Sequence, residues 1–309
     1  MRYGVIVHGG AWNIPDNLVE EHLKGVRKAC LEASEILEDS EGTALNAAEH
    51  AITLMEKNPI FDAGMGSFVN QIAEVEMDAI IATDEYKIGS VAAIQNINNP
   101  VQVARLVMEK TDHIMLVGKG ANLFAREMGF PEVQPQDLLI GRELERYHEI
   151  REKQVYRSKD AFRRQGKPEG HGTVGCVCFD QTGSFCVALS TGGTPYKRAG
   201  RVGDTPLWGS GAYVEKNIGG AAATGYGEDL IRILATNTCI QYIKAGSSTQ
   251  KAASQTIRDL DIKVNGLGGI IVLTSSGIGL AFNTPRMAYA YQIENQEVTC
   301  GINPEDFQS

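Results

Sequence analysis

Five short turns rich in glycine and threonine carry most of the groups in this sequence that could do chemistry. Glycine lets the backbone approach a ligand closely, and the amide groups that open a helix favour negative charge. Each turn alone is a weak signal, but together they predict an anion-binding site able to stabilise an oxyanion. The turns are His8-Gly9-Gly10, His171-Gly172-Thr173, Ser190-Thr191-Gly192-Gly193, Gly200-Arg201-Val202-Gly203-Asp204 and Thr224-Gly225-Tyr226-Gly227-Glu228.

The signatures of several large enzyme classes are missing. The sequence has no Gly-x-Ser-x-Gly elbow, no His-Glu-x-x-His helix and no Gly-x-x-x-x-Gly-Lys-Ser/Thr phosphate loop. Cys176, Cys178 and Cys186 lack a second Cys or His pair at zinc spacing, so they are interpreted as buried apolar thiols. No metal site is assigned from side chains.

The balance of charges argues against nucleic acid and membrane partners. The 309 residues include 29 Lys or Arg and 38 Asp or Glu, which gives a formal net charge of −9, opposite to what phosphate backbones or anionic lipids select. No secretion signal or spanning apolar stretch is visible, and the six cysteines are dilute. A cytoplasmic protein is expected, of one large domain or two small ones.

Hydrophobic periodicity places most of these turns at strand ends in a mixed α+β protein. Apolar runs predict strands, and apolar residues every three or four positions predict helices. Because strands and helices come in blocks, a mixed α+β layer fold is favoured over a doubly wound parallel sheet. Strands are predicted at 3–8, 74–84, 89–95, 113–118, 173–180, 184–191, 208–213, 220–224, 269–274, 277–283 and 287–293; helices are predicted around 23–37 and 45–55, from 100, after 118, and at 228–244 and 249–260.

The segment 151–171 has a different composition from the rest of the chain. It has few apolar residues and several turn formers, so it is interpreted as an exposed, mobile linker rather than a basic docking site. Its basic residues are Arg151, Lys153, Arg157, Lys159, Arg163, Arg164 and Lys167.

The order of the motifs resembles that of the plant-type asparaginases and isoaspartyl peptidases, a family of N-terminal-nucleophile hydrolases. The similarity covers nearly the whole chain, and several motifs in the right order are far more specific than any one of them. Besides the turns at 8–10, 190–193, 200–204 and 224–228, the matching motifs are Glu74-Val75-Glu76-Met77-Asp78-Ala79, Gly172-Thr173-Val174-Gly175 and Gly266-Leu267-Gly268-Gly269.

The resemblance implies that the precursor cuts itself between Gly172 and Thr173. An α-subunit of residues 1–172 and a β-subunit of residues 173–309 would then remain one structural domain. A threonine hydroxyl is a weak nucleophile until a base takes its proton, and a freed α-amino group, with a pKa of about 7.7–8.0, serves near neutral pH. In the uncut chain that nitrogen is an amide without basicity, so cleavage is expected to switch the enzyme on.

Catalytic roles follow from the resemblance. Thr173 is expected to be the nucleophile, with its own amine as general base and Thr191 as a neighbouring hydroxyl that orients them. Thr224 Oγ and the Gly225 N–H are expected to form the oxyanion hole.

Substrate-binding roles follow in the same way. Arg201 is expected to bind the substrate α-carboxylate through its two-pronged guanidinium, and Asp204 with the Gly227 carbonyl is expected to bind the α-ammonium. With Thr224 and Gly225, these residues would select a zwitterionic aspartyl head group.

The architecture implied by the resemblance is a four-layer αββα sandwich, with two central sheets between helical layers. Cut protomers are expected to pair as a dimer of αβ heterodimers. No cofactor is implied for catalysis, but a structural alkali cation, usually sodium, is implied in the loop Met55–Ser67, where backbone carbonyls would hold it.

One position departs from the family pattern. Many family members have Asn where this chain has Asp62. A carboxylate close to the active site is expected to raise the pKa of the Thr173 amine or to slow self-cleavage.

The implied activity is hydrolysis of the side-chain amide of L-asparagine and of β-aspartyl dipeptides, through a covalent β-aspartyl ester on Thr173. A glycosylasparaginase-like or taspase-like enzyme would share this nucleophile, but the missing signal and glycosylation sites argue against the first and the short segment before Thr173 against the second. Two non-hydrolytic alternatives remain: a degenerate aspartate-binding protein that keeps Arg201 and Asp204, and a glycine-rich nucleotide-binding protein.

Overall fold

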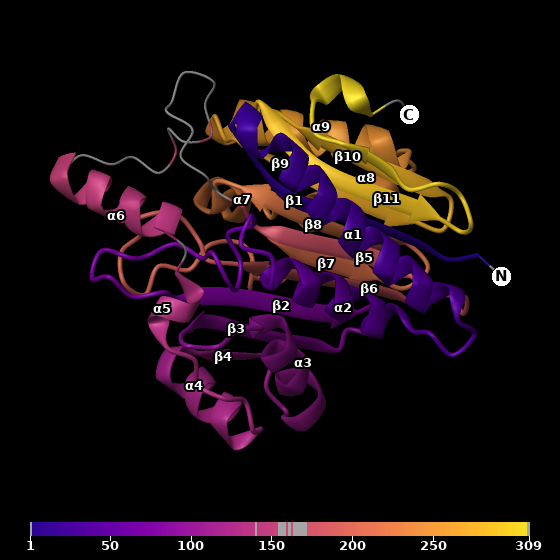
Figure 1. Ribbon diagram of the computed structural model, residues 1–309. Coiled ribbons are helices and arrows are strands. Elements are labelled where there is room, and N and C mark those ends of the chain that lie inside the picture. Colours follow the sequence, from indigo (N-terminus) through magenta and orange to yellow (C-terminus); the bar gives the residue numbers. More distant parts are fainter. Residues whose placement is uncertain (1, 140, 154–158, 160–161, 163–171, 308–309) are drawn as a thin grey trace.

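Two β-sheets with helices packed against them make up the described part of the chain. The computed structural model describes residues 2–139, 141–153, 159, 162 and 172–307 (Figure 1). Its strands are β1 (Gly4–Trp12), β2 (Met77–Thr83), β3 (Ile88–Ile94), β4 (Met115–Val117), β5 (Val174–Phe179), β6 (Phe185–Thr191), β7 (Ala212–Glu215), β8 (Gly219–Gly225), β9 (Gly268–Thr274), β10 (Gly277–Phe282), β11 (Arg286–Ile293) and β12 (Thr299–Gly301). Its helices are α1 (Val19–Glu38), α2 (Ala44–Glu56), α3 (Pro100–Lys110), α4 (Gly118–Glu127), α5 (Pro135–Leu138), α6 (Gly141–Lys153), α7 (Gly227–Ile233), α8 (Ala235–Lys244) and α9 (Thr249–Val264), with short 3₁₀ turns at Asp16–Leu18 and Pro304–Asp306.

The larger sheet interleaves strands from both halves of the chain. Its order is β12-β11-β1-β5-β6-β2-β3-β4, and the smaller sheet runs β10-β9-β8-β7. Strand β5 lies between β1 and β6, and is antiparallel to both, with His8 opposite Gly175 and Val174 opposite Ser190. The start of β5 is therefore held on both sides, by a strand from the first half of the chain and by one from the second.

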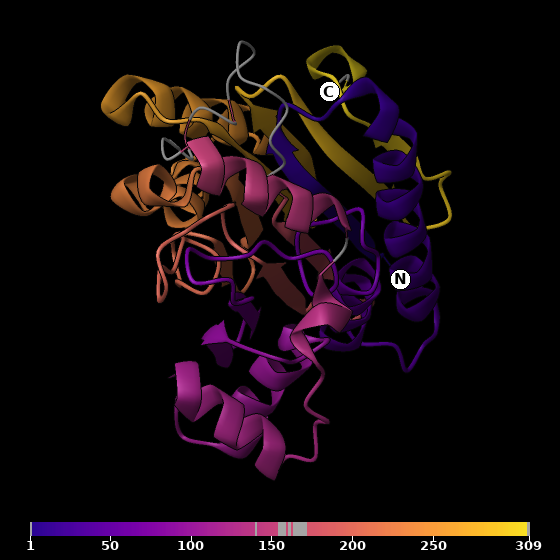
Figure 2. The ribbon, with the colours of Figure 1, turned by 60° about the vertical axis from the view of Figure 1, so that its left-hand side comes forward.

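Alternation along the strands divides the apolar residues between separate cores. On β1, Val5 and Val7 belong to a cluster shared with α1, α2 and α3, whereas Ile6 belongs to a second cluster shared with the smaller sheet. This is the period of two that a strand imposes on its side chains. A third cluster packs the smaller sheet against α7, α8 and α9. Figure 2 shows the indigo α1 and the orange helices on opposite sides of the sheets.

The cysteine interpretation is confirmed. Cys176 and Cys178 point from β5 into the same cluster as α1 and α2, and Cys186 of β6 joins them there. All three are buried free thiols. Burial raises the pKa of Cys178 and Cys186 well above the ordinary thiol value, so both stay protonated and apolar.

The mixed α+β class is confirmed, but three sequence predictions need correction. The helix predicted at 228–244 is broken at Leu234, which has a left-handed φ of +49° and separates α7 from α8. The strand predicted at 208–213 begins only at Ala212, because Trp208 makes no more than an isolated bridge. Strand β12 and the helices α5 and α6 were not predicted.

The third correction concerns the predicted linker. Its first residues, Arg151–Lys153, end helix α6, which buries Tyr147 and Ile150 against the body of the protein. Phe162 is only 1% exposed, so this aromatic residue is not part of an exposed loop. Apart from these residues and Lys159, the predicted linker lies outside the described residues. Within the described ranges, every helix is too short or too polar to cross a bilayer.

Candidate active site

Thr173 directly precedes strand β5, and its hydroxyl points toward Thr191. Thr173 Oγ1 donates a hydrogen bond of 3.2 Å to Thr191 Oγ1, which also accepts one of 3.0 Å from the Gly193 N–H. The two threonines meet because β5 and β6 pair in antiparallel register at that end. Thr173 is 9% exposed, so its hydroxyl is held in a defined place with limited access to water.

His8 lies on the strand beside Thr173. It lies opposite Gly175 on the neighbouring strand, where its Nε2 fills the space that a side chain on Gly175 would need. Burial lowers the pKa of His8 to about 3, although a hydrogen bond with the Thr173 backbone opposes the shift. The ring is therefore neutral at physiological pH and adds no charge to the site.

Thr224 and Gly225 end strand β8 on the other side of the site. Thr224 Oγ1 accepts a hydrogen bond of 3.3 Å from the Ala11 N–H, so its own hydroxyl proton remains available as a donor. Gly225 has φ +147°, and a Cβ there would lie 2.4 Å from Gly268 Cα. Only glycine fits this conformation and this close approach.

Arg201 forms a two-pronged ion pair with Glu228, the second residue of α7. Its Nε and Nη2 atoms donate to Glu228 Oε1 and Oε2 at 2.9 and 2.8 Å. Burial opposes the charge of Arg201, but the hydrogen bonds and charge of Glu228 outweigh it and raise the pKa of the guanidinium. The guanidinium therefore already binds one planar carboxylate in bidentate geometry, which is also the geometry in which it could bind the carboxylate of a substrate.

Asp204 lies beside Arg201 and is almost fully buried. Its Oδ2 has no hydrogen-bond partner among the described residues. Burial raises the pKa of Asp204 to about 7, even though Arg201 opposes this. Gly227 lies against both side chains, because a Cβ there would be 2.9 Å from both Arg201 Nη2 and Asp204 Oδ1. An unsatisfied buried carboxyl at this place is suited to a cationic group supplied by a ligand.

A single small pocket joins these groups. Its volume of about 10 Å³ is roughly that of one water molecule. Phe162 enters the pocket wall from the segment before Thr173, and its ring packs edge-on to Tyr226 at 6.1 Å between centroids. The complete lining is Phe162, Gly172, Thr173, Thr191, Gly193, Thr194, Arg201, Gly203, Asp204, Thr205, Thr224, Gly225 and Gly227.

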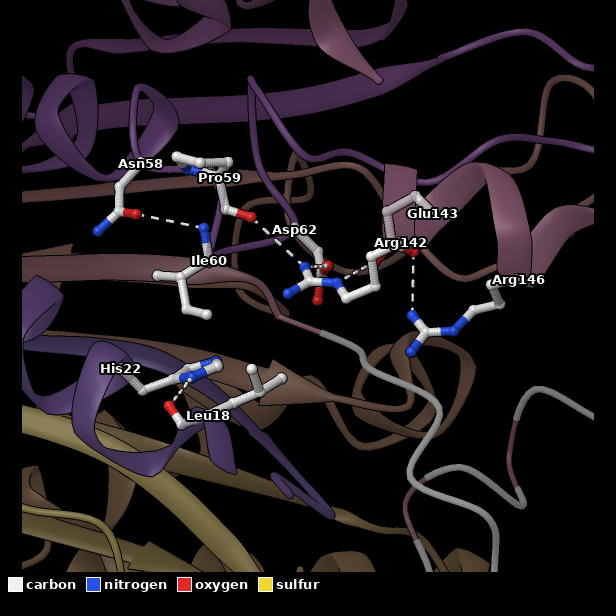
Figure 3. Close-up of polar contacts among 9 residues, drawn as sticks. All are labelled: Leu18, His22, Asn58, Pro59, Ile60, Asp62, Arg142, Glu143 and Arg146. Atoms are coloured by element: carbon white, nitrogen blue, oxygen red, sulfur yellow. Dashed lines mark hydrogen bonds and ion pairs between the residues drawn. The ribbon is translucent and has the colours of Figure 1, made fainter. Parts of the chain in front are cut away.

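Asp62 lies next to Gly172, which precedes Thr173. A Cβ on Gly172 would be 2.9 Å from Asp62 Oδ2, and the Gly172 backbone forms a hydrogen bond with the carboxyl group. Arg142 of α6 approaches the other oxygen, with Nη2 3.5 Å from Asp62 Oδ1 (Figure 3). The position that departs from the family pattern is therefore at the predicted cleavage site itself.

The structure places in one pocket the residues to which the sequence gave catalytic, cleavage or substrate-binding roles, and it adds others that were missed. These residues are Gly172, Thr173, Thr191, Arg201, Asp204, Thr224, Gly225 and Gly227. Glu228 was quoted in a motif but given no role, although an acidic residue in the first turn of a helix is a candidate partner for a nearby arginine. Lys197 is buried beside Gly193 and donates to the Glu76 carbonyl at 2.7 Å. Phe162 stands alone in a polar run, so no periodicity could reveal it.

Comparison with known proteins points to the same family as the order of the motifs does, and the matches span nearly the whole chain. The profile of a family described as asparaginase matches residues 1–302. A Xenopus laevis protein named isoaspartyl peptidase/L-asparaginase is 38% identical over 304 residues, which covers 98% of this chain and 96% of the relative. A Pyrococcus horikoshii protein named plant-type L-asparaginase is 40% identical, over 95% of this chain and 97% of the relative. The chain therefore belongs to the asparaginase family.

Proposed function

We propose that the protein is an autoprocessed threonine amidohydrolase that cleaves the side-chain amide of L-asparagine and β-aspartyl dipeptides. The observation that carries this proposal is the shared pocket, in which the Thr173 hydroxyl, the Thr224 hydroxyl and the Arg201 and Asp204 side chains meet. Relatives named isoaspartyl peptidase/L-asparaginase and plant-type L-asparaginase support the same substrate class.

The proposed activation is a rearrangement of the Gly172–Thr173 peptide. Thr173 Oγ attacks the Gly172 carbonyl carbon, the C–N bond breaks, and the proton from the hydroxyl ends on the nitrogen. Water then hydrolyses the ester, which leaves a Gly172 carboxylate and a Thr173 with a free α-amine. That amine can act as general base, because a free α-amino group ordinarily has a pKa of about 7.7–8.0.

The proposed catalytic cycle uses the same hydroxyl on the substrate. The Thr173 amine accepts the hydroxyl proton, Oγ attacks the side-chain carbonyl, and the Thr224 hydroxyl and Gly225 N–H stabilise the oxyanion. The amine returns its proton to the leaving nitrogen, and water hydrolyses the β-aspartyl ester. Thr191 keeps the Thr173 hydroxyl in place through their hydrogen bond of 3.2 Å.

The uncut chain is proposed to be inactive for a second reason. Phe162 lines the pocket, and the space that remains, about 10 Å³, is too small for an aspartyl group. Glu228 also satisfies the guanidinium of Arg201 at 2.8 Å. Release of the segment before Thr173 would open the pocket and let a substrate carboxylate compete with Glu228 for Arg201.

The finer architecture belongs to the same proposal. The clusters that join α1–α3 to the larger sheet, the two sheets to each other, and the smaller sheet to α7–α9 support a four-layer αββα sandwich. The subunits would be residues 1–172 and 173–309, in one domain. The cut protomers would pair as a dimer of heterodimers in the cytoplasm.

The loop Met55–Ser67 fits a structural sodium ion. Gly66 has φ +90°, and a Cβ there would lie 2.8 Å from the Pro59 carbonyl oxygen and 2.9 Å from that of Phe61. Converging carbonyl oxygens suit a hard cation. We propose that these carbonyls would hold the ion and brace the loop that carries Asp62. Catalysis itself needs no cofactor in this scheme.

Mass spectrometry and a substrate panel test the proposed function directly. After incubation, the purified protein should yield two fragments, the second beginning with Thr173. The cut protein should hydrolyse L-asparagine and β-Asp-Leu in preference to an N-glycosylated asparagine. An intact chain that binds aspartate but hydrolyses none of the three would instead identify a non-catalytic binding protein. Tight nucleotide binding without amide hydrolysis would identify the nucleotide-binding alternative.

Replacement of Thr224 tests the oxyanion hole. Thr224→Val keeps the side-chain shape but removes the hydroxyl donor, so kcat should fall by about 10²- to 10³-fold. Rates are normalised to the concentration of free Thr173 N-termini, because the variant can also slow self-cleavage. Thr224→Ser retains the donor and should keep most of the activity. Equal rates for the valine and serine variants would show that the Thr224 hydroxyl is not part of the oxyanion hole.

A further inference from the structure

Lys197 is buried against the turn that follows Thr191. The residue is only 4% exposed, and its Nζ donates a hydrogen bond of 2.7 Å to the Glu76 carbonyl. A Cβ on Gly193 would lie 2.8 Å from Lys197 Nζ and 2.9 Å from its Cδ, so the lysine side chain runs directly against this glycine. Lysine is almost never buried to this degree unless its charge is paired, so the ammonium occupies a defined place.

The main chain of Lys197 is fixed by the segment that precedes β2. The Lys197 carbonyl accepts a hydrogen bond of 2.8 Å from the Gln71 N–H, and the Tyr196 N–H donates to the Val69 carbonyl at 2.9 Å. The main chain and the ammonium of Lys197 are therefore anchored at two separate places. The side chain between these anchors is the part that lies against Gly193.

Asp78 supplies a negative charge close to this ammonium. It is fully buried and lies directly opposite Thr191, where β2 and β6 pair. Burial lowers the pKa of Lys197, but the charges of Asp78 and Glu76 oppose this shift. Lys197 in turn opposes the rise that burial causes in the pKa of Asp78. The two buried groups therefore stabilise each other's charge on the strand beside Thr191.

A short series of contacts leads from Lys197 to the nucleophile. Gly193 has φ +83°, and a glycine in this conformation is restrained only by what packs against it. Its N–H donates a hydrogen bond of 3.0 Å to Thr191 Oγ1, and the same oxygen accepts one of 3.2 Å from the Thr173 hydroxyl. Among the described residues, Gly193 lines the pocket and Lys197 does not. A shift of Gly193 would therefore reach Thr173 through Thr191.

From these contacts we propose that Lys197 is a positioning residue for the reaction of Thr173: its anchored side chain holds the turn after Thr191, and so keeps the Thr191 hydroxyl where it orients the nucleophile. The inference rests on the proposed function, because it concerns the same nucleophile. Lys197 transfers no proton in this scheme and makes no contact with the substrate. Self-cleavage and turnover both depend on it, since both use the Thr173 hydroxyl.

Replacement of Lys197 by methionine tests this role, because methionine keeps an unbranched side chain but lacks the ammonium. The kcat for L-asparagine, normalised to free Thr173 N-termini, should fall by about 10- to 10²-fold, which is what a small displacement of a reacting group costs. KM should stay nearly unchanged, because the groups proposed to bind the substrate are retained. Lys244→Met is the matched control: Lys244 forms an exposed ion pair with Glu215 at 2.7 Å, and its loss should leave the kinetics unchanged.

A double-mutant cycle with Thr191→Ala shows whether the effect passes through Thr191. If it does, adding Lys197→Met to Thr191→Ala should change kcat by no more than about twofold. Independent effects would multiply, so a further loss of about tenfold or more in the double variant would overturn the inference. Where a variant cuts itself too slowly for steady-state assays, the same cycle is measured on the rate constant of self-cleavage in freshly translated chain.

The outcomes separate this inference from the proposed function. A wild-type kcat in Lys197→Met, or a rise in KM at constant kcat, would overturn the role of Lys197 alone. Absence of hydrolysis by the wild-type protein would overturn the proposed function and the inference with it.

Folding is checked separately, by the melting temperature of each variant. Lys197→Met deprives the buried Asp78 of a nearby cation, so its melting temperature should fall. Lys197→Gln retains a donor for the Glu76 carbonyl and takes its place in the cycle if the methionine variant does not fold.

Discussion

Thr173→Ala should remain a single chain of 33.5 kDa and should hydrolyse neither L-asparagine nor β-aspartyl dipeptides. The substitution removes the hydroxyl that attacks both the Gly172 carbonyl and the substrate. Loss of the nucleophile in comparable hydrolases lowers kcat by about 10⁴-fold or more. Denaturing gels and release of ammonia from asparagine measure both effects.

Thr173→Ser provides the matched control. Serine retains a hydroxyl at the same place and should still cut the chain, though it lacks the methyl group on Cβ that limits the rotation of the threonine side chain. Thr191→Ala tests the orientation of the nucleophile apart from the nucleophile itself. It removes only the hydroxyl that accepts the hydrogen bond of 3.2 Å from Thr173, so it should reduce activity less than Thr173→Ala does. Full turnover by the uncut Thr173→Ala chain would contradict the assignment of the nucleophile.

Arg201→Lys should weaken the use of substrate by about 10²-fold or more in kcat/KM. Truncating one partner of a buried, hydrogen-bonded charge pair costs roughly 2–5 kcal/mol, and each 1.4 kcal/mol is a factor of ten. Lysine keeps the charge but cannot make the bidentate contact with a carboxylate. Steady-state kinetics with L-asparagine and with an analogue lacking the α-carboxylate would measure the effect.

The analogue that lacks the α-carboxylate shows whether Arg201→Lys acts on carboxylate binding or on the fold. If Arg201 binds the α-carboxylate, the wild-type enzyme should use the analogue poorly, and Arg201→Lys should change that rate little. Arg232→Ala serves as a control, since Arg232 pairs with Asp229 on the same helix but is exposed. An equal loss with both substrates would show that Arg201 supports the fold through Glu228 and does not bind the carboxylate.

The parts of the fold that follow from local patterns were predictable. The alternation of apolar residues in β1 and β5 reflects two buried faces, and it also accounts for the thiols of Cys176 and Cys178 on one of them. Gly225 lies where only glycine can pass Gly268. A local requirement of this kind, such as a buried strand face or a position that only glycine can occupy, restricts the residue type and can therefore be predicted from the sequence.

Contacts between segments that are distant in the sequence could not be predicted in this way. The pairing of Arg201 with Glu228 depends on how the loop between β6 and β7 folds back over α7. Asp62 and Arg142 meet only because α6 packs over the loop after α2. Leu234 breaks a helix although leucine is a good helix former, and its exposed side chain gives no local signal of the break.

The place of β5 between β1 and β6 has a consequence for the mature enzyme. Scission before β5 would produce two polypeptides whose backbones hydrogen-bond to each other through the middle of one sheet. Neither piece could bury its own apolar faces after separation. Unfolding would then be a dissociation, its reversal would depend on protein concentration, and a denatured sample of cut enzyme should recover far less readily than the intact precursor.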